Sequence, residues 1–385
     1  MEVHSLSPLV LLHAVILCHT VNGDNQEIYP TYDFNKTITD EWTPDLYDTT
    51  YPYYGIYSES VLSIVNWKNT EFIPSIHTVV FLVALPLNIM AIVIFLVKMK
   101  VRKPAMVYML NLATADVLFV SVLPFLIIYR FSGNNWLMGE EMCRFVMAAF
   151  YCNMYCSILF MTSISVDRFI AVAYAVRSLS WRTVNRAWLV CGVIWTISLA
   201  STVPLLVGEQ TMFISELNIT TCYDVQYSED LRGFYFYYFT TLLSLLFFLP
   251  LFITTFCYIR IIHNLSTIKM NNMRKRLRAI YLTVIVLCVF ALCFGPTNVL
   301  HFSYYLQMYY YDDDSLYEAY TLSSTICSIS CCLDPLIYYL ASSQCQRYVY
   351  SLLGRKKDYR PPRRQHSALT DKEEYTEVIF REETC

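Results

Sequence analysis

The chain has 385 residues, of which 56% are hydrophobic and only 15% charged, with a formal net charge of −3. Soluble domains carry about 25% charged residues, so this composition argues against a set of ordinary soluble domains. Apolar runs recur along the chain, and each is long enough to cross a bilayer, which needs about 20 residues. We therefore predict an all-α membrane protein and expect no nucleic-acid partner.

The first apolar run, Leu9 to Cys18, is too short to span a membrane. It resembles the core of a signal peptide over residues 1–23, because the small residues Val21 and Gly23 fit a cleavage after Gly23. The alternative is an uncleaved anchor, since no basic residue precedes the run. Residues 24–72 then form an extracellular, disordered tail.

Seven apolar runs follow and predict a seven-transmembrane helix bundle over residues 73–340. The predicted spans are Ile73–Val97, Pro104–Tyr129, Cys143–Val166, Ala187–Val207, Phe234–Ile259, Ala279–Leu300 and Leu316–Leu340. Lysine and arginine gather in the loops after spans one, three and five, whereas the opposite loops carry only Arg130, Arg144 and Arg232. This asymmetry places the N-terminus outside the cell. A short amphipathic helix over 341–353 and a cytoplasmic tail over 354–385 complete the expected domains.

Cysteines and glycosylation sequons follow the same orientation. The chain has 14 cysteines, and most lie within the spans, where they act as small apolar residues. Only Cys143 and Cys222 fall at the outer face of the mature chain, and two thiols in an oxidising compartment are expected to pair. Asn35 and Asn218 begin outside sequons and are candidate glycosylation sites.

Two carboxylates, Asp116 in NLATAD and Asp334 in LDPLIYY, lie at bilayer depth. Charged residues are costly there and often functional. Two neighbouring carboxylates cannot both stay ionised without a cation or a proton. We therefore hypothesise a sodium site, with Asn88 and Ser157 as further polar neighbours and no other cofactor. The alternative is that each aspartate is a structural hydrogen-bonding residue.

Prolines interrupt the deep parts of five spans. Each removes a backbone hydrogen bond and predicts a kink, at Pro124, Pro204, Pro250, Pro296 and Pro335. A bundle of kinked helices around polar residues can hold two arrangements of similar energy. A channel, a transporter or a receptor can use such a device.

A set of short motifs, one or two for each span, separates these classes. They are Asn88, NLATAD, Cys143 with Cys222, Asp167-Arg168-Phe169, Trp195, Pro250 with Tyr258, Pro296, and Asp334 to Tyr338. In this order they resemble the rhodopsin-like G-protein-coupled receptors over residues 72–353. Longer stretches resemble the thrombin-receptor branch of the protease-activated receptors, including YMLNLATADVLFVSVLPF, AAFYCNMYCSILFMT and CFGPTNVL. The chain shares with that branch Phe294, two residues before Pro296.

The resemblance implies a plasma-membrane receptor that couples to heterotrimeric G proteins and arrestin, not an enzyme. Asp167 would hold Arg168 in the resting state, and Tyr258 and Tyr338 would reorganise beneath it. The basic cytoplasmic loops would meet the G protein and membrane lipid. His77 and His301 stand isolated in the sequence, and no catalytic constellation is evident.

The resemblance also implies a peptide-binding site at the outer end of the bundle. Its expected contacts are Tyr151, Asp224, Tyr305, Tyr317 and Tyr320, although an aromatic residue near a span end can instead be an interfacial anchor. The family has Cys-His-Asp-Val at the second outer loop, whereas this chain has Tyr223 in place of the histidine.

In this family a serine protease such as thrombin cuts the N-terminal tail, and the new terminus binds its own receptor. The candidate cut lies between Lys36 and Thr37 and exposes TITDEW, while Asp40 to Asp48 resembles a protease-docking segment. The chain departs from the family here, because its candidate ligand has no arginine. A receptor for a free cationic peptide, a non-signalling protease-docking cofactor and, more distantly, a transporter stay open as alternatives.

Overall fold

The structure is a computed structural model. It describes residues 66–99, 101–174, 180–215, 217–223, 234, 236–267, 273–311, 316–341 and 345–346, all within one compact unit, Ser58–Cys385. Several predictions lie outside the described residues: the signal peptide, Asn35, the Lys36–Thr37 cut, Asp224, nearly all of the amphipathic helix and the C-terminal tail.

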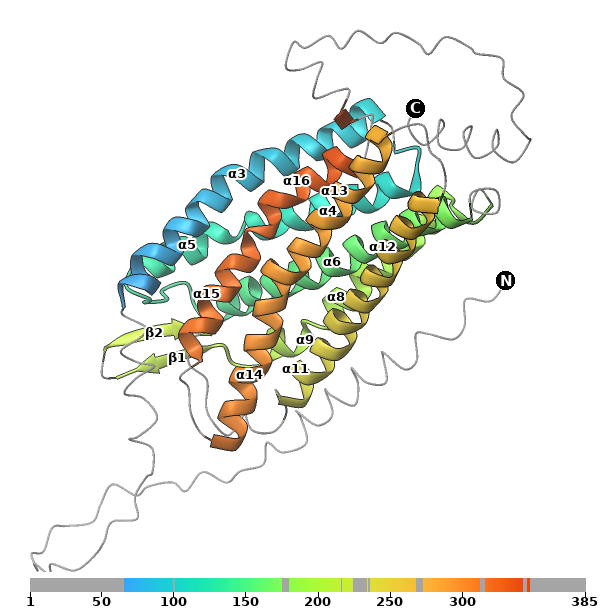
Figure 1. Cartoon of the computed structure of the whole chain (residues 1–385). Coiled ribbons are helices and arrows are strands. Elements are labelled where there is room, and N and C mark those ends of the chain that lie inside the picture. Colours follow the sequence, from blue (N-terminus) through green and yellow to red (C-terminus); the bar gives the residue numbers. More distant parts are fainter. Residues whose placement is uncertain are drawn as a thin grey trace, which may run out of the picture. The chain divides into compact units, whose positions relative to one another are not determined.

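The described chain is almost entirely helical, with one short hairpin (Figure 1). In order, the elements are η1 (Lys68–Phe72), α3 (Ile73–Val93), η2 (Ile94–Met99), α4 (Pro104–Val120), α5 (Leu123–Phe131), α6 (Glu140–Ala173), α8 (Val184–Ala200), α9 (Val203–Val207), β1 (Thr211–Ile214), β2 (Ile219–Cys222), α11 (Phe236–Leu242), η4 (Leu243–Phe248), α12 (Leu249–Thr267), α13 (Met273–Val289), η5 (Phe290–Phe294), α14 (Gly295–Tyr311), α15 (Tyr317–Ser328) and α16 (Ser330–Ala341). The η segments are π-helical.

These helices occupy the seven predicted positions. Five continuous stretches of described chain are long and apolar enough to cross a membrane. The other two positions hold interrupted helices, α8 with α9 and α15 with α16. The sixth helix runs from Met273 to Tyr311, well beyond the predicted Ala279–Leu300, because apolarity marks the bilayer and not the end of the helix.

A helix break or a π-helical segment lies at or near each of the five predicted prolines. Pro124 and Pro204 lie in the first turns of α5 and α9, where the missing N–H has no intrahelical partner. The π-helical segments η4 and η5 end just before Pro250 and Pro296, so the wide turn absorbs the lost hydrogen bond. Pro335 lies inside α16, which starts after a break at Ile329.

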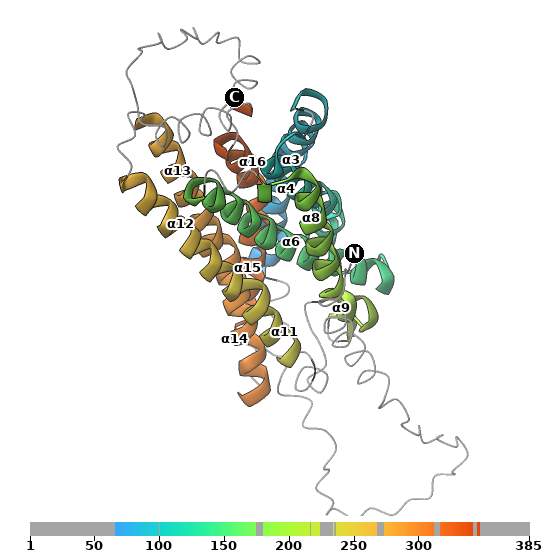
Figure 2. The same cartoon turned by 90° about the vertical axis from the view of Figure 1, so that its right-hand side faces the viewer.

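Helix α6 forms the centre of the bundle. It packs against α4, α8 and α12, and Figure 2 shows it running between α12 on one side and α4 with α8 on the other. Most of its residues are buried along the whole length. Large apolar side chains on the outer helices are exposed instead, among them Leu82, Phe252 and Ile259. Such a surface is matched to lipid.

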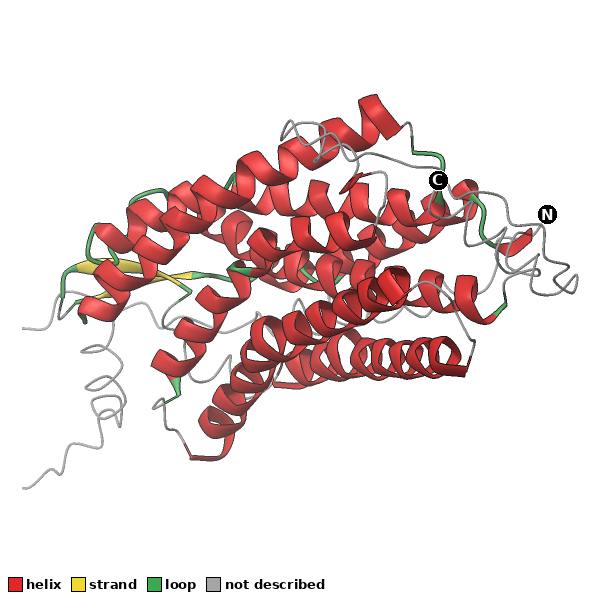
Figure 3. Cartoon of the chain, turned by 45° about the horizontal axis from the view of Figure 1, so that its top comes forward, coloured by secondary structure: helices red, strands yellow, loops and turns green. Residues whose placement is uncertain are grey.

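Strands β1 and β2 pair antiparallel, with Thr211 opposite Cys222 and Ile214 opposite Ile219. Figure 3 shows this hairpin at one end of the bundle, and Tyr317 at the start of α15 packs against Ile214 there. The turn between the strands includes Asn218 with φ of 52°, a left-handed conformation that asparagine tolerates. Asn218 is exposed, so the turn is open to the predicted glycan.

Candidate functional site

The hairpin is fixed to the outer end of the bundle from the side of β2. The predicted disulfide joins Cys222 to Cys143 near the start of α6. The Trp136 amide donates to the Thr220 carbonyl at 2.7 Å, and the Cys222 amide donates to the Tyr129 hydroxyl at 3.2 Å. The residue that follows β2 is therefore held over the centre of the helices.

That residue is Tyr223, whose φ of 64° turns the chain at the end of the hairpin. Its hydroxyl lies 2.9 Å from the Tyr151 hydroxyl, 3.2 Å from the Tyr305 hydroxyl and 3.3 Å from His301 Nε2. Burial raises the pKa of the Tyr223 hydroxyl well above its ordinary value. The group therefore keeps its proton at physiological pH and can donate as well as accept.

Tyr151 joins the remaining members of this group. Its hydroxyl lies 2.8 Å from the Tyr320 hydroxyl and 3.2 Å from His301 Nε2. The His301 ring stacks on Tyr320 with centroids 4.6 Å apart and is tilted against Phe239 at 4.1 Å. We call Tyr151, Tyr223, Tyr305, Tyr320 and His301 the hydroxyl cluster. It gathers polar atoms from α6, the second outer loop, α14 and α15.

Three of the five predicted ligand contacts, Tyr151, Tyr305 and Tyr320, belong to this cluster. Tyr317 does not, because it packs with Ile214 beneath the hairpin in a separate apolar group. His301 is a member of the cluster that the sequence interpretation missed. Its position four residues before Tyr305 puts both on one face of a helix, which is the signal that was available.

A second polar group, the polar core, lies deeper in the bundle. Asp116 and Asp334 are fully buried, and their carboxyl groups are close enough to influence each other electrostatically. The Tyr338 hydroxyl donates to Asp116 Oδ2 and to Asn88 Oδ1, both at 3.4 Å. Asn88 in turn donates to the Cys331 carbonyl at 2.9 Å. Tyr338 therefore lies with the carboxylates in this structure.

Several buried oxygens of the polar core have no hydrogen-bond partner among the described residues. They are Asp116 Oδ1, both Asp334 carboxylate oxygens, Asn153 Oδ1 and Ser157 Oγ. Buried oxygens without donors are costly, and a hard cation binds such oxygens. This group of buried oxygens therefore fits a bound sodium ion. Asn153, whose amide donates to Cys331 Sγ at 3.5 Å, was not among the predicted residues. No described contact joins Ser157 to the carboxylates.

At the inner end of α6, Asp167 is bound by Arg182. The Arg182 Nε lies 2.8 Å from Asp167 Oδ1, and Nη2 lies 2.8 Å from Oδ2. The sequence interpretation assigned Asp167 to Arg168 and did not include Arg182. Tyr258 is buried near Arg168.

Phe294 and Pro296, the motif residues of the sixth helix, lie at the end of its π-helical segment η5 and just after it. Phe294 is fully buried and packs edge-on against Phe290, with ring centroids 5.9 Å apart. Pro296 follows two residues later, in the first turn of α14. This is the site of the wide turn, so a change in bend at this position moves one half of the helix relative to the other.

The comparisons with known proteins agree with this arrangement. Residues 87–338 match the 7 transmembrane receptor (rhodopsin family). The chain is 62% identical over 292 residues to Proteinase-activated receptor 1 of Xenopus laevis, which covers 76% of this chain and 69% of the relative. It is 57% identical over 293 residues to Proteinase-activated receptor 1 of Homo sapiens, with the same coverage. It is 39% identical over 298 residues to Proteinase-activated receptor 2 of Homo sapiens, covering 75% of each. The chain belongs to the rhodopsin family of seven-transmembrane receptors, within the proteinase-activated receptors.

Proposed function

We propose that this chain is a plasma-membrane receptor that an extracellular serine protease activates by cutting its N-terminal tail, and that it signals through heterotrimeric G proteins. The observation that carries the proposal is the 62% identity to a proteinase-activated receptor over 292 residues. The match to the rhodopsin family, over residues 87–338, includes every residue of the hydroxyl cluster and the polar core.

The place where the tail joins the bundle supports a tethered ligand. Asn66 Nδ2 donates to Glu318 Oε1 at 3.3 Å, and Lys68 Nζ lies 2.9 Å from Glu318 Oε2. Glu318 lies in the first turn of α15, the helix that also carries Tyr320 of the hydroxyl cluster. The base of the tail is thus fixed to the start of that helix. A tethered peptide reaches about millimolar effective concentration, so a weak ligand suffices.

We further propose that the cut follows Lys36 and that the new N-terminus, Thr37, leads a ligand that acts on the hydroxyl cluster. Any ligand that enters there competes with the contacts between the second outer loop and α14. The fifth and sixth helices have π-helical segments just before Pro250 and Pro296, where they can bend, so movement of α14 can be passed to the cytoplasmic end. Arrestin and membrane lipid are proposed as further partners on that side.

We also propose that sodium binds the polar core. Asp116 and Asp334 would supply carboxylate oxygens, and Asn88 and Ser157 complete the polar surroundings. When bound, the cation neutralises two buried like charges and so favours the arrangement in which they face each other. Tyr338 already links the two helices that carry Asn88 and Asp116, by donating to both.

The proposed function is tested by following cutting and signalling together. A reporter tag is placed at Asp24, the full chain is expressed in receptor-null cells, and thrombin or trypsin is added. Loss of the tag with a calcium rise, both abolished in Lys36→Gln, is the expected result. Loss of the tag without calcium would favour a docking cofactor. Retention of the tag with every protease would instead favour a receptor for a free cationic peptide.

A further inference from the structure

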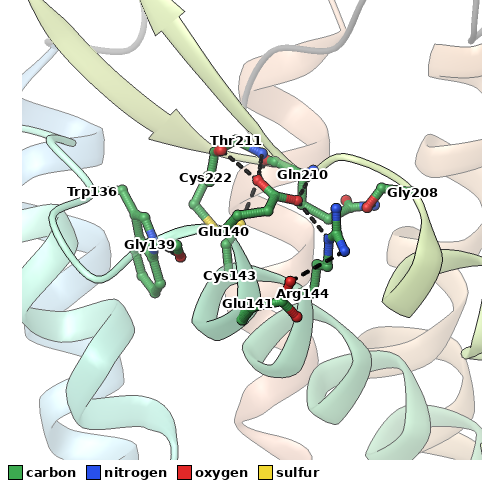
Figure 4. Close-up of polar contacts among 10 residues, drawn as sticks. All are labelled: Trp136, Gly139, Glu140, Glu141, Cys143, Arg144, Gly208, Gln210, Thr211 and Cys222. Carbon is green, nitrogen blue, oxygen red and sulfur yellow. Dashed lines mark hydrogen bonds and ion pairs between the residues drawn. A yellow bond between two sulfur atoms is a disulfide. The ribbon is translucent and has the colours of Figure 1, made fainter.

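Glu140, the first residue of α6, uses both carboxylate oxygens to hold the start of β1 (Figure 4). Oε1 accepts from the Gln210 amide at 2.7 Å and from Arg144 Nε at 2.7 Å. Oε2 accepts from the Thr211 amide at 2.9 Å and from the Thr211 hydroxyl. Hydrogen bonds to an ionised acceptor are stronger than hydrogen bonds between neutral groups.

The neighbouring acid makes no comparable contact. The Glu141 side chain is 88% exposed, whereas that of Glu140 is 27% exposed. Glu141 forms an ion pair with Arg144 Nη1 at 3.4 Å. Two consecutive glutamates at the start of one helix therefore have different surroundings, and only Glu140 reaches the hairpin through a described contact.

Gln210 connects Glu140 to Tyr223 by two backbone hydrogen bonds. The Gln210 amide donates to Glu140, and the Gln210 carbonyl accepts from the Tyr223 amide at 2.8 Å. The disulfide fixes β2 at Cys222, next to Tyr223. Since Thr211 pairs with Cys222, the two anchors grip the same end of the hairpin on its two different strands.

We propose that Glu140 is a positioning residue of the ligand-binding site, because its carboxylate fixes β1 against α6 and so holds Tyr223 in the hydroxyl cluster. The disulfide and the hydrogen bonds of Thr220 and Cys222 all fix strand β2. Glu140 supplies the corresponding anchor on strand β1. The inference concerns the second outer loop itself, and it rests on the proposed function only where signalling is the readout.

The first test needs no ligand. Amide hydrogen exchange is measured on the full chain, purified in detergent, for the wild type, Glu140→Gln and the matched control Glu141→Gln. Glutamine keeps the size of the side chain but lacks the charge and cannot accept at its NH₂ group. Exchange over residues 209–215 and 220–223 is expected to be about tenfold faster in Glu140→Gln and unchanged in Glu141→Gln. Thr211→Val, which removes only the hydroxyl contact, should give a smaller increase.

Equal exchange in Glu140→Gln and Glu141→Gln would overturn the proposal. If Glu140→Gln does not reach the membrane, Thr211→Val is compared with the wild type instead. Exchange in Thr211→Val at the wild-type rate would then overturn the proposal.

The second test separates positioning from mere folding. Trypsin-evoked calcium release and tag release are measured in receptor-null cells. Glu140→Gln is expected to shift the calcium response to higher trypsin concentration while tag release is unchanged. In a Tyr223→Phe background the added shift should be lost. A shift that is retained in full there would contradict an action through Tyr223. A wild-type chain that gives no calcium signal would refute the proposed function, while the exchange comparison would still decide the role of Glu140.

Discussion

Arg182 holds both carboxylate oxygens of Asp167, each at 2.8 Å, across the loop between α6 and α8. Both side chains are largely buried, with 14% of Arg182 and 6% of Asp167 exposed. Two parallel hydrogen bonds from one guanidinium are the strongest form of this pair. Asp167 is adjacent to Arg168, the residue that the resemblance assigns to contact with the G protein. By holding the Asp167 side chain, Arg182 therefore determines which charged groups surround Arg168.

Arg182→Gln should lower the free energy of unfolding by about 2 kcal/mol, less than the loss of a fully buried partner because the pair is partly hydrated. Much of that cost comes from leaving the Asp167 carboxylate alone. The double variant Asp167→Asn/Arg182→Gln should therefore cost less than the sum of the two single variants. Thermal unfolding of the purified chain in detergent measures all three.

The matched control for this cycle is Arg186→Gln. Arg186 is exposed, and its guanidinium contacts the carbonyls of Ser180 and Trp181. The substitution Arg186→Gln should change the free energy of unfolding by less than about 0.5 kcal/mol. Strictly additive costs for Asp167→Asn and Arg182→Gln would mean that the two side chains do not form a stabilising pair.

Tyr223→Phe removes one hydroxyl and keeps the ring. That hydroxyl contacts Tyr151, Tyr305 and His301, and its loss leaves buried partners short of a hydrogen bond. We expect stability to fall by about 1–2 kcal/mol. The control is Tyr237→Phe, since Tyr237 is 65% exposed on the outside of α11. An equal effect of both substitutions on thermal unfolding would rule out the hydroxyl cluster as a stabilising unit.

The fold was predictable because the bilayer imposes a simple rule. Every backbone group within it must be bonded internally, so each apolar run of sufficient length is a helix. The prolines marked the breaks for the same reason, since each removes one of those bonds. Helix ends in water, such as Met273 and Tyr311, carry no such signal, and the hairpin Thr211–Cys222 was not foreseen.

The candidate site was predictable only in part. Asp116 and Asp334 stood out because charge is rare at bilayer depth. Glu140, Arg182 and His301 are ordinary residues of a helix terminus, a loop and a helix interior, and their roles depend on partners in other elements. The contact between His301 and Tyr151 joins positions 150 residues apart. No local pattern reveals such a pair.

Lys68 is the second lysine of the tail, and trypsin should not cut after it. It begins the helical segment Lys68–Phe72, and its ammonium group pairs with Glu318. A protease needs an extended backbone at the cut, so local unfolding must come first. With one tag at Asp24 and another inserted after Asp48, trypsin should release the first and leave the second on the cell. Lys68→Gln should change neither result, and release of the second tag from the wild type alone would contradict the prediction.

Sodium should stabilise the chain through Asp116 and Asp334. A cation that binds only the folded state adds about 1.4 kcal/mol for each tenfold rise in its concentration above the Kd. Asp116→Asn removes one of the two facing carboxylates, so the variant should lose this dependence and be less sensitive to the absence of salt. The measurement is thermal unfolding in detergent across a sodium chloride series, with choline chloride at equal ionic strength as the control. Equal stabilisation by choline chloride would mean that sodium acts only by screening charges at the same ionic strength. An unchanged sodium dependence in Asp116→Asn would place the cation elsewhere and leave the two buried carboxylates to share a proton instead.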